Sequence, residues 1–164
     1  MFLAATEESK SDFDPHPKGV CKGVCVEVVT KNKQGIPYQS KNEDGGEKKF
    51  KLALVFQTEK TFEVEEGELR QCTHWEWFNI PKCILNENGK LHKFLNTWEV
   101  DVKGYETPEK FADAVVGRPA HLVFMHNKGK DGKMYSNLTS CSSVDDAEDA
   151  YVAKDYKLHN QVPF

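Results

Sequence analysis

Lysine and aromatic side chains are the residues of this chain whose types and spacing could do chemistry. The lysines recur in two loop-like segments, and flat aromatic side chains lie within or beside them. An ammonium group can neutralise a phosphate and an aromatic ring can stack on a base, so together they are typical of single-stranded nucleic-acid binding. The candidate binding residues are Lys31, Lys33, Tyr38, Lys49, Lys51, Trp75, Trp77, Lys128, Lys130, Lys133 and Tyr135.

A predicted hairpin near the end of the chain presents three of these lysines. Residues 121–126 and 134–141 alternate between apolar and polar side chains, and the segment between them contains Gly129 and Gly132. Alternation around a glycine-containing loop predicts two paired strands. A basic tip suits a polyanion, but the same charge could serve solubility alone.

A second lysine-bearing loop, residues 31–48, connects the first two predicted strands. The β-branched run at 20–30 predicts the first strand, and Gly23 inside it indicates a bulge or a sharp bend. Residues 49–57 alternate cleanly, which predicts a half-buried second strand. Gly-Ile-Pro and Asp-Gly-Gly breakers between these strands predict the polar loop, which also contains Lys41 and Lys48.

The remaining pattern predicts a third strand, two short helices and the hairpin. The third strand covers residues 71–80, after an acidic segment, 62–68, that is either a connector or a short strand. Apolar spacing predicts a helix near 91–98. A second short helix is predicted by Thr107 as cap, Pro108 at the first helical position and Gly117 as terminator. The predicted order is three strands, a helical insert and two strands. This is the element order of the OB-fold, a mainly β, five-stranded Greek-key barrel. The ligand-binding loops of that fold join strands one to two and four to five. Those are the two lysine-bearing loops.

The strand tryptophans have two open interpretations. Trp75 and Trp77 lie on one face of the third predicted strand. If that face lines a groove, the rings stack on bases; if it faces inward, they fill the core. Tyr38 lies in a polar loop with little core to join, and Tyr135 begins the last strand beside the lysine tip, which favours a ligand role for both.

Composition describes an ordinary chain of 164 residues with one domain and a real core. The net charge of −4 argues against a nucleic-acid partner at first, but the acids concentrate at both ends and the central part is slightly basic. No membrane-spanning run or secretory signal is evident, so we expect a cytoplasmic protein. Five cysteines without paired spacing indicate reduced thiols.

Metal binding and catalysis are the competing chemistries. Cys21, Cys25, Cys72, His74 and Cys83 could supply zinc ligands, but none forms a Cys-x-x-Cys pair. The chain has no phosphate-binding Gly-x-x-x-x-Gly-Lys-Ser/Thr loop, no His-Glu-x-x-His motif and no serine in a nucleophile elbow. We therefore expect no cofactor, no bound metal and no enzymatic activity.

Several motifs resemble the small OB-fold single-stranded-DNA-binding proteins of tailed bacteriophages. They lie within residues 16–143: HPKG at 16–19, CVEVV at 25–29, KLALVF at 51–56, LHKFLNTW at 91–98, VGRP at 116–119, VFMHN at 123–127 and GKMYSNL at 132–138. The acidic segment near 63–68 and extra residues at 99–107 depart from the pattern. The resemblance implies single-stranded DNA binding in replication, recombination or repair, in the cytoplasm of a host cell.

The two ends of the chain are expected to differ from the domain between them. We expect an extended segment at 1–19, the OB-fold domain at 20–141 and an acidic, flexible tail at 142–164. The chain ends in Pro163 and Phe164. Bacterial single-stranded-DNA-binding proteins end in an acidic tail tipped by Pro-Phe that partner enzymes grip, so this ending predicts a docking tip for replication or recombination proteins.

Two alternatives to single-stranded DNA binding stay open at this point. One is an OB-fold module that binds a protein, for instance as an inhibitor of a host defence system, and the other is a small-nucleotide binder. The sequence does not distinguish RNA from DNA, and it leaves a homo-oligomer open.

Overall fold

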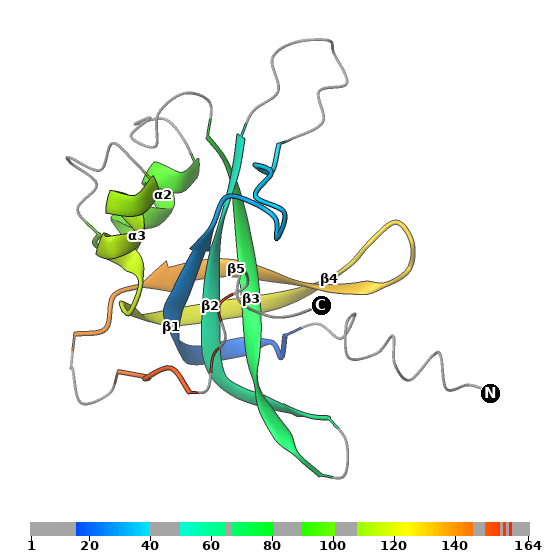
Figure 1. Ribbon diagram of the computed structural model, residues 1–164. Helices are drawn as coiled ribbons and strands as arrows, with labels where there is room; N and C mark the ends of the chain where they lie inside the picture. The colour runs from blue at the N-terminus through cyan, green and yellow to red at the C-terminus, as the bar shows by residue number, and fades with distance from the viewer. Residues whose placement is uncertain are drawn as a thin grey trace.

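A curled antiparallel sheet of five strands forms the body of the protein in the computed structural model (Figure 1). The structure describes residues 16–39, 50–64, 67–80, 90–100, 108–145, 150–154, 156 and 158. The strands are β1 (Gly19–Val29), β2 (Phe50–Glu63), β3 (Leu69–Ile80), β4 (Pro119–Lys128) and β5 (Met134–Ser142). Two helices, α2 (Lys90–Thr97) and α3 (Pro108–Val115), come between β3 and β4. The mainly β class and this element order are confirmed.

The strands lie in the order β3-β2-β1-β4-β5, so β1 is the middle strand. Its first half pairs with β4, from Gly19 opposite Phe124 to Val24 opposite Pro119, and its second half pairs with β2 as far as Val29 opposite Ala53. A strand that changes partners midway must bend, and β1 is visibly bent in Figure 1. This bend curls the sheet into a half-barrel.

The irregularity predicted at Gly23 lies a few residues further along the strand. The register with β2 shifts between Cys25 and Glu27, which is a β-bulge. Gly23 instead allows close packing, because a Cβ atom there would come within 2.7 Å of the Leu122 side chain and 3.1 Å of the Gln57 carbonyl oxygen. The glycine therefore permits β2 and β4 to approach β1 from both sides.

The main core fills the concave side of the sheet, beneath the two helices. Leu52, Leu54 and Phe56 of β2 point into it, as do Leu122 and Phe124 of β4. The helices, together with the residue that follows α2, add further fully or nearly fully buried side chains: Leu91, Leu95, Trp98, Phe111 and Val115. The amphipathic spacing that predicted the helices is thus explained by their contact with the inside of the sheet.

A second apolar cluster lies on the convex side, and it corrects the prediction that β2 is half buried. Ala53 and Val55, on the outer face of β2, are both 0% exposed. They pack with Val24, Val26 and Val29 of β1 and with five aromatic residues, Tyr38, Trp75, Trp77, Tyr151 and Tyr156. We call this set the outer cluster. The alternating pattern did not reveal it because alanine and valine suit either face of a strand.

The acidic segment at 62–68 belongs to a long hairpin. β2 and β3 remain paired as far as Glu63 opposite Leu69, and the Val64 amide donates to the Glu68 carbonyl oxygen over 2.8 Å. Gly67 occupies the left-handed region at φ 80°, which a tight turn requires. The strand alternative for this segment is therefore correct for residues 62 and 63. Within the described part of the chain, neither helix could cross a membrane.

Candidate nucleic-acid interface

Trp75 and Trp77 lie on the outer face of β3 and not in the main core. They stand opposite Val55 and Ala53 of β2, and both side chains belong to the outer cluster. Their ring centroids are 5.8 Å apart with 38° between the planes. Both side chains are partly buried. The sequence left two predictions open, that these rings stack on bases or that they fill the core. The structure places both rings outside the main core, where they remain partly exposed.

Tyr38 and Lys51 join these tryptophans on the same face. The Tyr38 ring meets the Trp77 ring edge-on, with centroids 5.1 Å apart. The Lys51 ammonium nitrogen lies 6.0 Å from the centre of the Trp77 ring, within reach of a cation–π contact. We call Tyr38, Lys51, Trp75 and Trp77 the aromatic face. Residues from a loop and two strands thus converge on one patch.

The loop after β1 is fixed by its own hydrogen bonds. The Asn32 side-chain oxygen accepts from the amides of Gln34 and Ile36, each over 2.9 Å, which closes a tight turn. The Tyr38 amide donates to the Thr30 carbonyl oxygen, and the Tyr38 carbonyl oxygen accepts from the Lys51 amide, both over 2.9 Å. Tyr38 therefore ties the loop to β1 and β2, and the position of its ring follows from this backbone pairing.

Lys31 and Lys33 belong to the same loop as Tyr38 but are not members of the aromatic face. Lys31 is exposed where the chain leaves β1, and its backbone bridges to Pro37. Lys33 lies within the turn and is partly buried. Lys49, another of the candidate binding residues, lies outside the described residues.

The β4–β5 hairpin carries the other three lysines on a ribbon that extends from the body of the sheet (Figure 1). Lys128, Lys130 and Lys133 are all exposed. In Figure 1 the loop after β1 stands near the upper part of the sheet and the hairpin tip extends to the right.

An aspartate that the sequence reasoning missed organises the hairpin tip. The Asp131 carboxylate accepts from the Lys133 amide over 2.9 Å and from the Tyr135 hydroxyl over 2.5 Å. These hydrogen bonds hold the pKa of Asp131 below its usual value of 3.8, with the Tyr135 bond the larger cause. The Tyr135 ring also packs so closely on Gly129 that a Cβ atom there would lie 2.6 Å away. Tyr135 thus shapes the turn, in addition to any contact with a ligand.

Replacing Asp131 with alanine should loosen this tip. The ionised carboxylate is the acceptor, so hydrogen exchange of the Lys133 amide should accelerate by about 2- to 10-fold. Because folding lowers the pKa, the carboxylate stabilises the tip fully above pH 3.8 and loses that effect as the pH falls through the lower folded-state pKa. Hydrogen exchange measured by NMR in wild type, in Asp131→Ala and in the control Lys130→Ala checks this prediction. Equal protection in all three proteins would contradict it.

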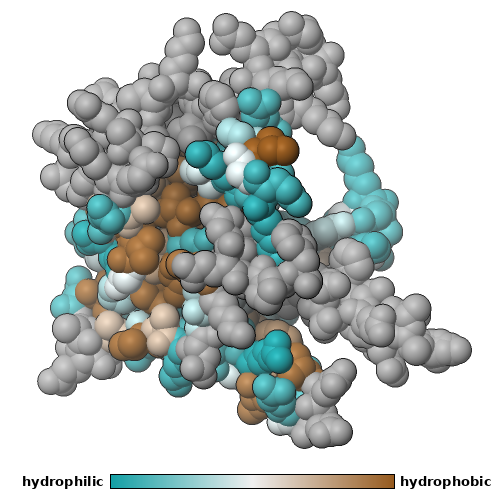
Figure 2. Space-filling model, in the orientation of Figure 1, coloured by the Kyte–Doolittle hydropathy of each residue, from teal (hydrophilic) through white to brown (hydrophobic). Residues whose placement is uncertain are grey.

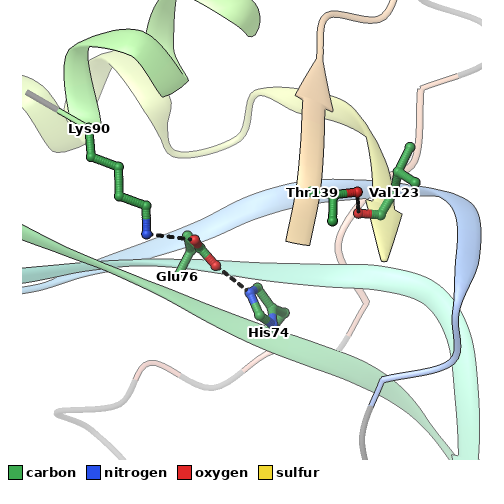
Figure 3. A network of polar contacts seen from close by, with 5 residues as sticks. All are labelled: His74, Glu76, Lys90, Val123 and Thr139. Carbon is green, nitrogen blue, oxygen red and sulfur yellow. Dashed lines mark hydrogen bonds and ion pairs between the residues drawn. The ribbon is translucent and has the colours of Figure 1, made fainter. Parts of the chain in front are cut away.

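A separate polar network lies on the concave side of β3 (Figure 3). Glu76 accepts from His74 over 2.8 Å and pairs with Lys90 of α2 over 3.3 Å. Burial alone would raise the pKa of the Glu76 carboxyl group, but the hydrogen bonds and charges of His74 and Lys90 hold it below its usual value. The network joins α2 to β3 beside a hollow of about 280 Å³ that β5 also lines.

A buried histidine fixes the start of the described chain on the sheet. His16 stacks on Phe124 with ring centroids 3.9 Å apart, and its two ring nitrogens lie 2.9 Å from the Pro17 carbonyl oxygen and 2.6 Å from the Thr58 hydroxyl. The Pro17 carbonyl can only accept, so Nδ1 carries the proton. Burial lowers the pKa of His16. The neutral ring is therefore a structural anchor before β1.

The cysteines behave as small core residues. Cys21, Cys25, Cys72 and Cys141 are buried and free, and burial raises the pKa of each thiol, that of Cys21 to about 11 and that of Cys25 to about 12. The described residues contain no group of three or more histidine, cysteine, aspartate or glutamate side chains arranged to hold a metal ion. Cys83, one of the zinc candidates, lies outside that part of the chain.

The C-terminal part of the chain packs on the convex side of the sheet, which the sequence reasoning did not foresee. β5 continues to Ser142, and Tyr151 and Tyr156 join the outer cluster further along. The Tyr156 hydroxyl donates to the Glu27 carboxylate over 2.6 Å. We call residues 151–156 the C-terminal strap. Two tyrosines within an acidic segment were the available signal, because a freely solvated tail rarely needs large aromatic side chains.

The predicted docking tip, Pro163 and Phe164, lies outside the described residues. Comparisons of the chain with protein-family models, with curated proteins and with solved structures gave no match.

Proposed function

We propose that this protein binds single-stranded DNA on the outer face of β2 and β3 and catalyses no reaction. The observation that carries the proposal is the aromatic face, where Tyr38, Trp75 and Trp77 adjoin one another with Lys51 over a ring. Each base that stacks on an aromatic side chain contributes about 1–3 kcal/mol whatever its identity, so such a face favours binding with little sequence preference.

The finer fold assignment, an OB-fold, belongs to the same proposal. A Greek-key barrel of this kind needs β1 between β2 and β4 and a helical segment before β4, and both features are present. Closing the barrel would bring β3 and β5 together. In this fold, oligonucleotides lie across strands two and three between the loops that join strands one to two and four to five. The aromatic face occupies the corresponding strands here.

The phosphates of the bound strand would be neutralised from both sides of this face. Lys31 and Lys33 come from the loop after β1, and Lys128, Lys130 and Lys133 come from the hairpin. Bases on the aromatic face and phosphates beside these lysines would place the bound strand over β2 and β3. A role in phage-type replication, recombination or repair follows from the family resemblance and is part of the proposal.

A fluorescence titration with oligo-dT at several salt concentrations tests the function. We expect quenching of tryptophan fluorescence and an affinity that falls steeply with salt, because each neutralised phosphate releases about 0.7 counterion from a single strand. Replacing Lys128, Lys130 and Lys133 together with alanine should flatten the logarithmic salt dependence by about 2. Lys93→Ala, an exposed lysine on α2, is the matched control.

Two outcomes would overturn the proposal. One is the absence of binding to oligo-dT at low salt. The other is equal affinity for duplex and single-stranded DNA, because paired bases cannot stack on protein side chains. A parallel titration with oligo-U decides between DNA and RNA.

A protein-binding module is the second candidate, and one observation favours it. A hollow of about 560 Å³ lies between β1, the turn after α3 and the C-terminal strap, and its lining is largely apolar. Figure 2 shows apolar side chains gathered on this part of the surface, left of centre. Copurification of a partner that survives nuclease treatment, from a protein that does not bind oligo-dT, would support this candidate over the first.

A further inference from the structure

The C-terminal strap is bound to β2 by a pair of hydrogen bonds between the Gln57 side chain and the backbone of Lys154. The Gln57 amide nitrogen donates to the Lys154 carbonyl oxygen over 2.7 Å, and the Lys154 amide donates to the Gln57 side-chain oxygen over 2.6 Å. Gln57 is only 3% exposed, so both bonds are sheltered from water. A buried side-chain amide satisfied in both directions fixes the register of the strap on β2.

Tyr151 is fixed by the same group of residues. Its hydroxyl donates to the Gln57 side-chain oxygen over 3.1 Å and accepts from the Gln71 amide nitrogen over 2.9 Å. Gln71 also donates to the Thr58 carbonyl oxygen over 2.9 Å. Residues of β2 and β3 therefore set the position of the Tyr151 ring, and the strap adds an aromatic side chain to the convex side.

Tyr151 continues the aromatic face along β3. Gln71, Trp75 and Trp77 are separated by even numbers of residues, so their side chains leave the strand on the same side. The four steps of strand from Gln71 to Trp75 correspond to about 13 Å. Tyr151 and both tryptophans pack on the same outer cluster. A strand of nucleic acid that follows β3 beyond Trp75 would therefore reach the Tyr151 ring.

A lysine lies near an aromatic ring at both ends of the row formed by Trp77, Trp75 and Tyr151. The Lys51 nitrogen lies 6.0 Å from the Trp77 ring centre, and the Lys154 nitrogen lies 5.9 Å from the Tyr151 ring centre. Lys154 is exposed, so its ammonium group can contact a phosphate while its backbone stays bonded to Gln57. Glu59 raises the pKa of the Tyr151 hydroxyl, and burial raises it more.

We propose that the C-terminal strap is part of the nucleic-acid-binding surface, with Tyr151 as an additional stacking residue and Lys154 as an additional phosphate contact. This inference rests on the proposed single-stranded DNA binding and extends its surface to residues far away in the sequence. The strap then forms one side of the binding surface, fixed to β2 by the two hydrogen bonds between Gln57 and Lys154.

Two substitutions test the inference in the full chain. Lys154→Gln removes the charge and keeps the backbone bonds to Gln57, so it should lower oligo-dT affinity by about 2- to 5-fold at low salt and flatten the logarithmic salt dependence by about 0.7. Tyr151→Leu removes the ring and should lower the affinity about 10-fold. Tyr151→Phe keeps the ring and should bind within about 3-fold of wild type.

The controls separate this inference from the proposed function. Lys93→Gln matches the charge change on α2, and thermal melting shows whether each variant remains folded. If wild type does not bind oligo-dT, the proposed function fails. If wild type binds and both Lys154→Gln and Tyr151→Leu bind equally well, only the inference fails. Tighter binding by a folded Tyr151→Leu protein would also overturn it, because the strap would then compete with DNA.

Discussion

Replacing Trp75 and Trp77 together with leucine should remove most of the affinity for single-stranded DNA. Two stacked bases contribute about 2–6 kcal/mol in total, so the double variant should bind oligo-dT at least about 30-fold more weakly. Leucine is chosen because both tryptophans pack in the outer cluster with Ala53 and Val55, and an apolar side chain maintains that packing. The measurement is a titration with a fluorescently labelled oligo-dT, since the variant lacks two of the three tryptophans.

A second pair of substitutions shows whether stacking is the cause of that loss. Phenylalanine at both positions retains flat rings, so the Trp75→Phe/Trp77→Phe protein should recover a large part of the affinity that the leucine variant loses. Unfolding in urea should show that both variants remain folded. Binding by the leucine variant within about 3-fold of wild type would mean that the rings only cover the outer cluster.

The sequence predicted the elements well because most of them depend on local patterns. Alternation predicted β2 and the β4–β5 hairpin, and Pro108 and Gly117 correctly indicated where α3 begins and ends. Gly117 adopts φ 89°, the left-handed conformation that glycine permits at a helix end. These signals need only neighbouring residues, which is why they could be recognised without a structure.

The convex side of the sheet could not be predicted in the same way. Its outer cluster combines β1, β2 and β3 with tyrosines about a hundred residues away, and no short pattern joins Gln57 to Lys154. The partly buried position of Trp75 and Trp77 follows from this long-range packing. The sequence therefore predicted which residues are candidates for binding, but it could not predict that the C-terminal strap lies against the same face.

Asp131 illustrates a second limit of the sequence reasoning. Counting lysines at residues 128–133 gave a purely basic tip, whereas the acid among them accepts two hydrogen bonds that shape the turn. Its effect depends on geometry within a few ångströms and not on charge balance. The tip is therefore less positive than its three lysines alone indicate, and two hydrogen bonds to Asp131 hold its turn.

Replacing Trp98 with alanine should affect stability more than any surface change described above. The side chain is 0% exposed, packs against Phe56 with ring centroids 5.4 Å apart and against Phe94 at 6.3 Å, and donates from its ring nitrogen to the Pro119 carbonyl oxygen over 2.9 Å. Removing a buried tryptophan typically costs about 3–5 kcal/mol, because a cavity remains in its place. Urea unfolding without DNA, followed by circular dichroism, measures the loss.

Trp98→Phe is the matched control for this prediction, because it keeps an aromatic ring in the core and removes only the hydrogen-bond donor and part of the volume. It should cost less than the alanine substitution, and it should leave oligo-dT binding by the folded protein unchanged, since Trp98 lies on the concave side. Its fluorescence should still be quenched by DNA, because Trp75 and Trp77 remain. A loss of quenching in Trp98→Phe would place the bound strand near the helices and contradict binding on the convex face. An unfolding cost below about 1 kcal/mol for Trp98→Ala would mean that the Trp98 side chain contributes little to the packing of the core.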